Sequence, residues 1–402
     1  MGTTTVAFRG KAQCRATSPS STENSSECSS PQQETLWEDL PDTLQDCVLA
    51  RLPLRDLFRC RVVCKRWDAK ILCPKFQKTF DEVLSRVSPC PLVLSYSGGD
   101  IVAAFEPELN CWKRLPSVAF CGGGSKYTRI RAGAGGLLCL IKRHIYDDAS
   151  SSDSSDEDEE EEEEDSIVVC NPLTKSWKVL PPTKNKFDEI HVAHMVLDEH
   201  TKVYQIILAG VQHGVSDTIS EIYDSVSNSW RSEDSRLPPN TELATCQRYS
   251  SAVCDGILYC VAWDLGNKGA GVISYNIKSG VFNDFVYRTP GPQCLQVVDC
   301  DEKVFIVVNS NLILELQPAT QTWQTVAKMP QQVLAGCSGE MFPCKCVATR
   351  DSILHFPGNN PCREIVVYSI KRGVWSSLHN YHPYYTLPIA SFPFKPTLGV
   401  PV

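Results

Sequence analysis

The stretch that decides the fold runs from Trp37 to Phe80 and reads WEDLPDTLQDCVLARLPLRDLFRCRVVCKRWDAKILCPKFQKTF. Leu40-Pro41-Asp42 is typical of a helix start, because proline suits the first turn and a carboxylate favours the positive end of a helix. Four apolar residues then recur at three- and four-residue steps, which predicts one apolar helical face: Leu44, Val48, Leu49 and Leu52.

Pro53 ends this helix, and two more short helices are predicted, one starting at 54–58 and one over 61–72. In the third helix, apolar Val62, Val63, Trp67 and Ile71 alternate with basic residues. A module of about forty residues cannot bury all of this apolar surface alone. Part of the surface is therefore expected to contact a partner.

These residues resemble an F-box, whose pattern has a Leu-Pro, a helix ending in Leu-x-x-Leu-Pro, and Val-Cys-Lys-x-Trp. The matching elements are Leu40-Pro41, residues 49–53 and residues 63–67. The resemblance implies docking onto a Skp-family adaptor of a cullin-based ubiquitin ligase. The contact residues that it implies are Leu40, Pro41, Leu44, Val48, Leu49, Leu52, Pro53, Val63, Cys64 and Trp67. The alternative is a three-helix cap whose apolar residues only form an internal core.

The composition narrows the class of protein. The 402 residues allow two or three domains, and no apolar run approaches the roughly 18 residues of a membrane span. The first residues have no apolar signal core, and the 20 cysteines include no pair of CxxC motifs. We expect reduced, buried thiols in a protein of the nucleus or cytoplasm. The cysteines in predicted strands are Cys139, Cys170, Cys254, Cys260 and Cys300.

Two polar segments are predicted to lack regular structure. Residues 1–35 are rich in Ser, Thr, Gln and Pro, which predicts a disordered tail. Residues 147–165 hold 13 acidic residues and no basic one, so that the formal net charge of −8 becomes +5 without them. This acidic segment is predicted to be a solvated loop. Casein-kinase-II-type phosphorylation is a second interpretation, because three serines have an acid three residues later: Ser150, Ser154 and Ser155.

From about Cys90 onward, one unit repeats. It contains an apolar strand, a turn with Asn or Asp, an aromatic residue and often a Leu-Pro. Examples are CNPLTKSW over 170–177 and YDSVSNSW over 223–230. The six copies place their signature aromatic residues at Trp112, Trp177, Trp230, Phe282, Trp323 and Trp375. Between the copies lie predicted hairpins, one with Asp255-Gly256 as a tight turn.

A period near 50 residues with a turn-then-Trp signature is typical of kelch repeats, in which each repeat forms one four-stranded propeller blade. This half resembles that of plant F-box/kelch-repeat proteins. The predicted fold is a small all-α F-box of three helices at 36–82, followed by an all-β kelch-type propeller at 90–402. Six copies predict six blades, with seven as the alternative. Residues 387–398 are predicted to pair with the strand near Leu92 and so close the ring.

Other functions have weaker support. His191 and His194 lie three apart on a predicted strand and so face opposite sides, and Cys344 and Cys346 have no matching pair nearby. We therefore expect no metal, no cofactor and no catalytic residue. A charge of +5 without clustered basic and aromatic residues argues against nucleic-acid binding.

The predicted function is that of the substrate-recognition subunit of an SCF-type ubiquitin ligase. Its F-box would bind the adaptor, and through it a cullin, while the propeller holds an unidentified protein target. Contact residues for the target are expected among Tyr127, Arg129 and Arg131 or over 381–385. The alternative is an F-box scaffold or transcriptional cofactor without ligase activity.

Overall fold

The structure is a computed structural model. It describes residues 37–87, 92–97, 100–106, 111–114, 128–142, 166–212, 217–233, 236–244, 251–289, 293–300, 303–309, 311–336, 345–349, 351–356, 365–378 and 390–402. The predicted tail 1–35, the acidic segment 147–165 and its three serines lie outside these residues.

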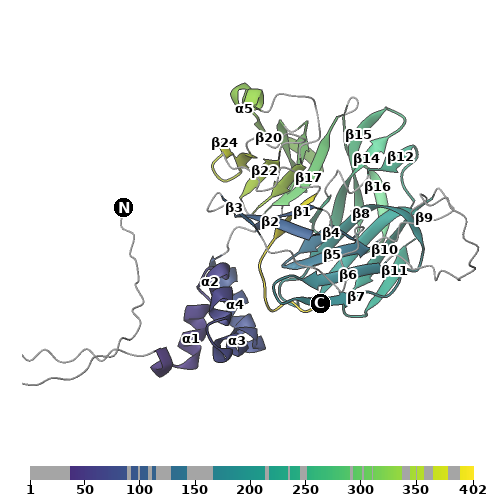
Figure 1. Cartoon of the computed structure of the whole chain (residues 1–402). Helices are drawn as coiled ribbons and strands as arrows, with labels where there is room; N and C mark the ends of the chain where they lie inside the picture. Colours follow the sequence, from purple (N-terminus) through teal and green to yellow (C-terminus); the bar gives the residue numbers. More distant parts are fainter. Residues whose placement is uncertain are drawn as a thin grey trace, which may run out of the picture. The chain divides into compact units, whose positions relative to one another are not determined.

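The N-terminal described segment is helical (Figure 1). It comprises the 3-10 turn Trp37–Asp39 and the helices α1 Asp42–Leu49, α2 Leu54–Arg61, α3 Lys65–Leu72 and α4 Pro74–Val87. The three predicted helices are present, but Arg61 is the last residue of α2, and α3 begins at Lys65 and not, as predicted, at Arg61. Helix α4 was not predicted, although Phe76 and Phe80 lie four residues apart, and both are buried with stacked rings 6.4 Å apart.

The remaining described segments form antiparallel sheets. In chain order the strands are β1 Leu92–Ser97, β2 Asp100–Glu106, β3 Cys111–Arg114, β4 Thr128–Ala134, β5 Leu137–Lys142, β6 Ser166–Asn171, β7 Ser176–Val179, β8 Phe187–Leu197, β9 Tyr204–Gln212, β10 Thr218–Asp224, β11 Ser229–Glu233, β12 Thr241–Leu243, β13 Ser251–Cys254, β14 Ile257–Asp264, β15 Gly269–Asn276, β16 Val281–Arg288, β17 Leu295–Cys300, β18 Lys303–Val308, β19 Leu312–Gln317, β20 Thr322–Lys328, β21 Lys345–Ala348, β22 Ser352–Phe356, β23 Ile365–Ser369, β24 Val374–Leu378 and β25 Ala390–Phe394. A short helix, α5 Gln331–Gly336, follows β20.

The strands form six sheets, four of which are meanders of consecutive strands. The six sheets are β25-β1-β2-β3, β4–β7, β8–β11, β12–β16, β17–β20 and β21–β24. In the first sheet β25 pairs with β1, and in the fourth both β12 and β13 pair with β14. The innermost strands contact one another in sequence, from β4 to β8, β13, β17, β21 and β25, and β25 contacts β4 again. The sheets therefore form a β-propeller.

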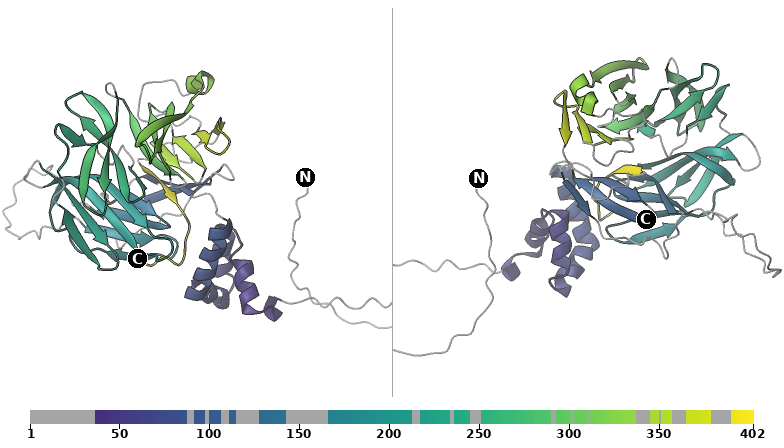
Figure 2. Two further views of the ribbon diagram at one scale, coloured as in Figure 1. Left: turned by 180° about the vertical axis from the view of Figure 1, so that it is seen from behind. Right: turned by 45° about the horizontal axis from the view of Figure 1, so that its top comes forward.

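Strand β25 closes this arrangement. It pairs antiparallel with β1, so that Leu92 lies opposite Phe394 and Tyr96 opposite Ala390. Both views of Figure 2 show the yellow C-terminal strand beside the blue N-terminal strands of the propeller. The predicted pairing with the strand near Leu92 is thus confirmed for residues 390–394 of the segment 387–398.

The propeller core lies between neighbouring sheets. One buried cluster joins Ile141 and Val169 of one sheet with Ile206 and Leu208 of the next. Apolar faces on both sides of a sheet explain why the strands read as near-continuous apolar runs. In the described ranges, no helix is long and apolar enough to cross a membrane.

Candidate functional site

Helix α1 presents apolar side chains to solvent. Leu44 is 51 % exposed and Val48 is 46 % exposed, and they lie one helical turn apart on the same face. Pro41, just before the helix, is also exposed, whereas Leu40 is half-buried. The Gln45 side chain is buried and donates hydrogen bonds to the carbonyl oxygens of Trp37 (3.0 Å) and Leu40 (2.9 Å). These bonds hold the start of α1 in place.

A second group of exposed apolar residues lies where α2 passes into α3. Val62 and Val63 are 86 % and 65 % exposed, and Cys64, the residue before α3, is exposed as well. The turn is held by the Arg61 guanidinium, whose Nε donates to Asp68 at 2.7 Å. Exposed Val side chains at the junction of two ordered helices cost free energy unless a partner covers them.

The F-box residues implied by the resemblance thus divide by burial. The exposed members are Pro41, Leu44, Val48, Pro53, Val63 and Cys64, and the half-buried ones are Leu40, Leu52 and Trp67. Leu49 differs from the expectation, because it is 1 % exposed. Its side chain packs in the interior of the helical segment. Helix periodicity alone does not separate Leu49 from Val48, its neighbour in sequence.

The repeat signature occupies one position in every sheet. Each signature aromatic lies on the outermost strand, opposite a residue of the adjacent strand. The pairs are Phe105–Trp112, Cys170–Trp177, Tyr223–Trp230, Tyr275–Phe282, Leu316–Trp323 and Tyr368–Trp375. The residue two before the aromatic has a positive φ in five copies. Those residues are Lys175, Asn228, Gly280, Gln321 and Gly373.

Side chains at the start of the hairpin stabilise this turn. The Asp224 carboxylate accepts hydrogen bonds from the backbone N–H groups of Val226 (2.8 Å) and Ser227 (3.2 Å). Asn171 and Asn276 accept the equivalent pairs of bonds in their copies. These are Asx turns, which explains why Asn or Asp recurs at this place in the sequence.

The indole rings of two copies connect neighbouring sheets. Trp230 is 4 % exposed, and its Nε1 donates to the carbonyl of Pro181 at 2.8 Å. Trp323 donates in the same way to the carbonyl of Val286 at 2.9 Å. In both cases the acceptor lies four residues after the signature aromatic of the preceding sheet. Trp177 differs, because it is 53 % exposed.

The connections differ in length between the two ends of the sheets. Because every sheet repeats the same antiparallel order, its first-to-second and third-to-fourth connections share one end, which we call the hairpin end. The connections at the hairpin end are short, for example residues 135–136, 255–256 and 277–280. The other end, the loop end, has the second-to-third connections and those between sheets. It includes the longest, 143–165 and 329–344.

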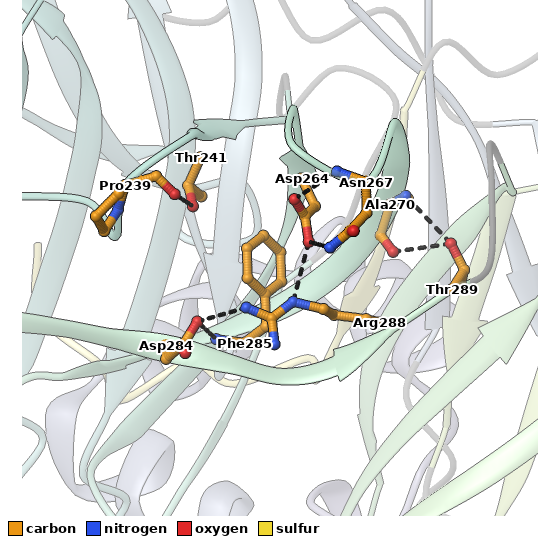
Figure 3. Close-up of polar contacts among 9 residues, drawn as sticks. All are labelled: Pro239, Thr241, Asp264, Asn267, Ala270, Asp284, Phe285, Arg288 and Thr289. Carbon is orange, nitrogen blue, oxygen red and sulfur yellow. Dashed lines mark hydrogen bonds and ion pairs between the residues drawn. The ribbon is translucent and has the colours of Figure 1, made fainter.

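One part of the loop end is held rigidly (Figure 3). The Arg288 guanidinium pairs with Asp264 at 3.0 Å and Asp284 at 2.8 Å, and it lies over the Phe285 ring at 4.6 Å from its centroid. Asp264 also accepts hydrogen bonds from the Asn267 side chain (2.7 Å) and backbone (3.1 Å). These bonds, and then Arg288, hold the pKa of Asp264 below its usual value.

This network fixes the β14–β15 loop and leaves Leu265 at its tip 55 % exposed. The Leu265 N–H donates to the Asn240 carbonyl at 2.8 Å, which ties the loop to the preceding connection. A fixed loop with an exposed leucine is suited to contact a protein. The sequence signal for it, Asp264-Leu265-Gly266-Asn267 between two strands, is that of a tight turn and does not by itself indicate binding.

The remaining candidates have more limited support. Arg131 lies on β4 and is half-buried, while Tyr127, the Arg129 side chain and 381–385 lie outside the described residues.

Among the described residues, no three His, Cys, Asp or Glu side chains group as metal ligands. His194 bonds to Ser251 at 2.9 Å. Cys346 is buried beside His355, and Cys344 lies outside the described residues.

The cysteines of the predicted strands are not part of disulfides. Cys139, Cys170, Cys260 and Cys300 are buried, and Cys254 is half-buried. Burial raises the pKa of Cys139 and Cys260 to about 12. Both thiols are therefore protonated and unreactive near neutral pH.

Comparison with known proteins agrees with this description. Residues 37–76 match the F-box domain family, and residues 159–325 match the family described as F-box associated beta propeller domain. F-box only protein 6 of Arabidopsis thaliana is 25 % identical over 347 residues, which cover 82 % of this chain and 66 % of that protein.

An F-box/kelch-repeat protein of Arabidopsis thaliana is 22 % identical over 74 % of both chains. A third relative, an F-box protein of the same plant, is 20 % identical over 87 % of this chain and 93 % of its own. Together with the helical segment and the propeller, these matches show an F-box followed by an F-box associated β-propeller domain, and the relatives are F-box proteins of Arabidopsis thaliana.

Proposed function

We propose that this chain is the substrate-recognition subunit of an SCF-type ubiquitin ligase. The observation that supports this most directly is the set of exposed apolar residues on ordered F-box helices, Leu44, Val48 and Val63 among them. They would bind a Skp-family adaptor, which connects the chain to a cullin. Pro41, Pro53, Cys64 and the half-buried Leu40, Leu52 and Trp67 would complete the contact.

The propeller would hold the target protein. We propose that the six sheets are the six blades of one kelch-type ring and that the target binds at the loop end. Strand β1, the second strand of its sheet, starts at the hairpin end. Leu265, fixed by the Arg288 network, is the first residue that we assign to target contact. The other candidates are Tyr127, Arg129, Arg131 and residues 381–385.

The chemistry of this function is proximity. A target held near a loaded ubiquitin carrier reacts at a high effective concentration, and a partner enzyme supplies the transfer step. The chain itself would act as a non-catalytic adaptor subunit in the nucleus or cytoplasm. Phosphorylation of Ser150, Ser154 and Ser155 would add negative charge to the acidic segment and favour a basic partner.

Adaptor binding tests this proposal. The double variant Leu44→Ala/Val48→Ala should bind a purified Skp-family adaptor roughly 30-fold more weakly than the wild type, because about 2 kcal/mol of apolar burial is lost. Both side chains are exposed, so the helices should stay folded, which circular dichroism can check. Val226→Ala, at an exposed apolar residue of the propeller, is the matched control.

Unchanged adaptor affinity of the double variant would contradict the assigned surface. Adaptor binding by the wild type, without any effect of the double variant on the half-life of bound targets, would instead favour the non-ligase scaffold. A propeller variant, Leu265→Asp, should keep adaptor binding and lose targets. Together the two variants separate the two ends of the proposed subunit.

A further inference from the structure

A cavity of about 430 Å³ lies between the innermost strands of the propeller. Its walls come from β4, β8, β13, β17 and β21, with Lys395 just after β25. Apolar side chains such as Val192, Val297 and Val347 form much of the lining. A cavity of this size, lined by apolar side chains and by several charged and polar ones, can hold a small molecule.

Asp299 is the unusual residue of this lining. It is the one exposed position of the otherwise buried strand β17, next to the last residue of the strand, and it lines the cavity. Burial raises the pKa of its carboxyl to about 6, and its own backbone N–H is the single group that lowers it. Among the described residues no cation pairs with it. A carboxylate enclosed in protein is normally paired with a positive group.

The other titratable groups that border the cavity pair with other side chains, are neutral, or lie away from Asp299. Lys395 pairs with Glu199 at 2.7 Å, and His191 lies 3.4 Å from Glu189. Burial lowers the pKa of His194 to about 4, so that it is neutral at pH 7. Neither Arg131 nor Lys345 lowers the pKa of Asp299.

The position of Lys345 follows from the strand geometry. The Cys300 thiol donates to the Thr349 carbonyl, which aligns the end of β17 with the end of β21. Lys345 begins β21 and therefore lies about three residues, roughly 10 Å, along the cavity from Asp299. Lys345 of β21 therefore places no positive charge directly beside Asp299.

We propose that the central cavity binds a small organic cation, whose ammonium or guanidinium group pairs with Asp299. The apolar walls would cover the aliphatic part of the ligand, and the low local dielectric would strengthen the charge-assisted hydrogen bond. Arg131 and Lys345 would disfavour a second cationic group at their own level. This inference goes beyond the proposed ligase function and does not depend on it.

Calorimetric titration of the full chain with pentylamine, which has one cationic group, tests the proposal. At pH 7.5 the wild type should bind pentylamine, Asp299→Asn should bind at least tenfold more weakly, and Asp255→Asn, at an exposed carboxylate in the β13–β14 turn, should bind like the wild type. Pentanol, which has the same length but no charge, should not bind detectably. Succinate should also fail to bind.

A second arm needs no substitution. Pentylamine should bind the wild type more weakly at pH 5 than at pH 7.5, because protonated Asp299 has no charge to pair while His194 remains neutral. Equal affinity of the wild type and Asp299→Asn, no pentylamine binding at pH 7.5, or preferential binding of succinate would each overturn the proposal. Adaptor binding is expected to be the same in all of these variants.

Discussion

Two titratable residues of the central cavity respond to burial in opposite directions. His194 has its pKa lowered to about 4, and Asp299 has its pKa raised to about 6, in both cases because the charged form loses water. Each shift makes the free energy of unfolding depend on pH. For His194, stability is lost as pH falls from 6.5 to about 4. For Asp299, stability is lost as pH rises from 3.8 to about 6.

The two dependences therefore oppose each other between about pH 4 and 6, and single substitutions should separate them. Asp299→Asn should leave the His194 dependence, so that stability rises with pH by on the order of 2 kcal/mol in this range. His194→Gln should leave the Asp299 dependence, with the opposite slope. Urea unfolding at several pH values measures both. Equal slopes in the two variants would contradict the assignment.

Glycine is required for different reasons at two positions. A Cβ on Gly210 would lie 2.0 Å from the Glu189 carbonyl oxygen, at the bulge where β8 pairs with β9. A Cβ on Gly256 would meet nothing within 4 Å, but this residue has φ +73° in the Asp255-Gly256 turn. The sequence predicted this second glycine from its turn signal, and the register Cys254–Ile257 confirms it.

Substitution should show the difference between these glycines. Gly210→Ala should cost at least about 3 kcal/mol, because backbone must move to admit the methyl group. Gly256→Ala should cost about 1 kcal/mol, the penalty of a left-handed conformation with a Cβ. Gly256→Asn should cost less, since Asn tolerates that conformation. Denaturant unfolding measures all three, and a Gly210→Ala cost below that of Gly256→Ala would contradict the account.

At the scale of elements, the outer hairpin of each sheet was the most predictable part of the fold. Its signal is local: an Asx turn, a residue with positive φ and an aromatic residue lie within eight positions. The innermost strands have no such signal, since their neighbours come from other sheets. For the same reason the cavity and the proposed role of Asp299 could not be predicted. A single Asp in an apolar segment does not indicate which residues of other sheets surround it.

The helical segment shows the same limit. The pattern predicted which residues of α1 are apolar, but burial of Leu49 and exposure of Val48 depend on how the helices pack. Helix α4 follows α3 after Cys73 alone, and Pro74 begins it. A proline at the first helical position is compatible with a helix start, so its presence did not mark the end of the helical segment.

The indole hydrogen bonds between sheets lead to a prediction about the repeat. Trp230→Phe and Trp323→Phe should each lower the free energy of unfolding by about 1–2 kcal/mol, since a carbonyl of the preceding sheet loses its donor. Trp177→Phe is the matched control at the same repeat position, and its exposed ring should make it cost less than about 0.5 kcal/mol. Equal costs at all three positions would show that the indole N–H is unimportant.

For the whole molecule, the pairing of β25 with β1 decides whether the sheets form a closed ring. The pairing joins residues about 300 positions apart, and the segment after β25 adds the buried residues Leu398 and Val400. Without β25, the edge of β1 is unpaired and β4 and β21 lose the strand between them. An open ring leaves apolar faces of two sheets uncovered.

Deleting residues 390–402 should therefore remove more than the five pairs of this ladder. We expect loss of a single cooperative thermal transition and new binding of a hydrophobic dye, because typical domain stabilities of about 5–15 kcal/mol do not survive an uncovered sheet. Deleting Pro401 and Val402 alone, which leaves β25 and Val400 in place, should shift the midpoint by only a few degrees. If the longer deletion unfolds at the wild-type midpoint, closure through β25 contributes little, and the contacts between neighbouring sheets suffice to hold the propeller.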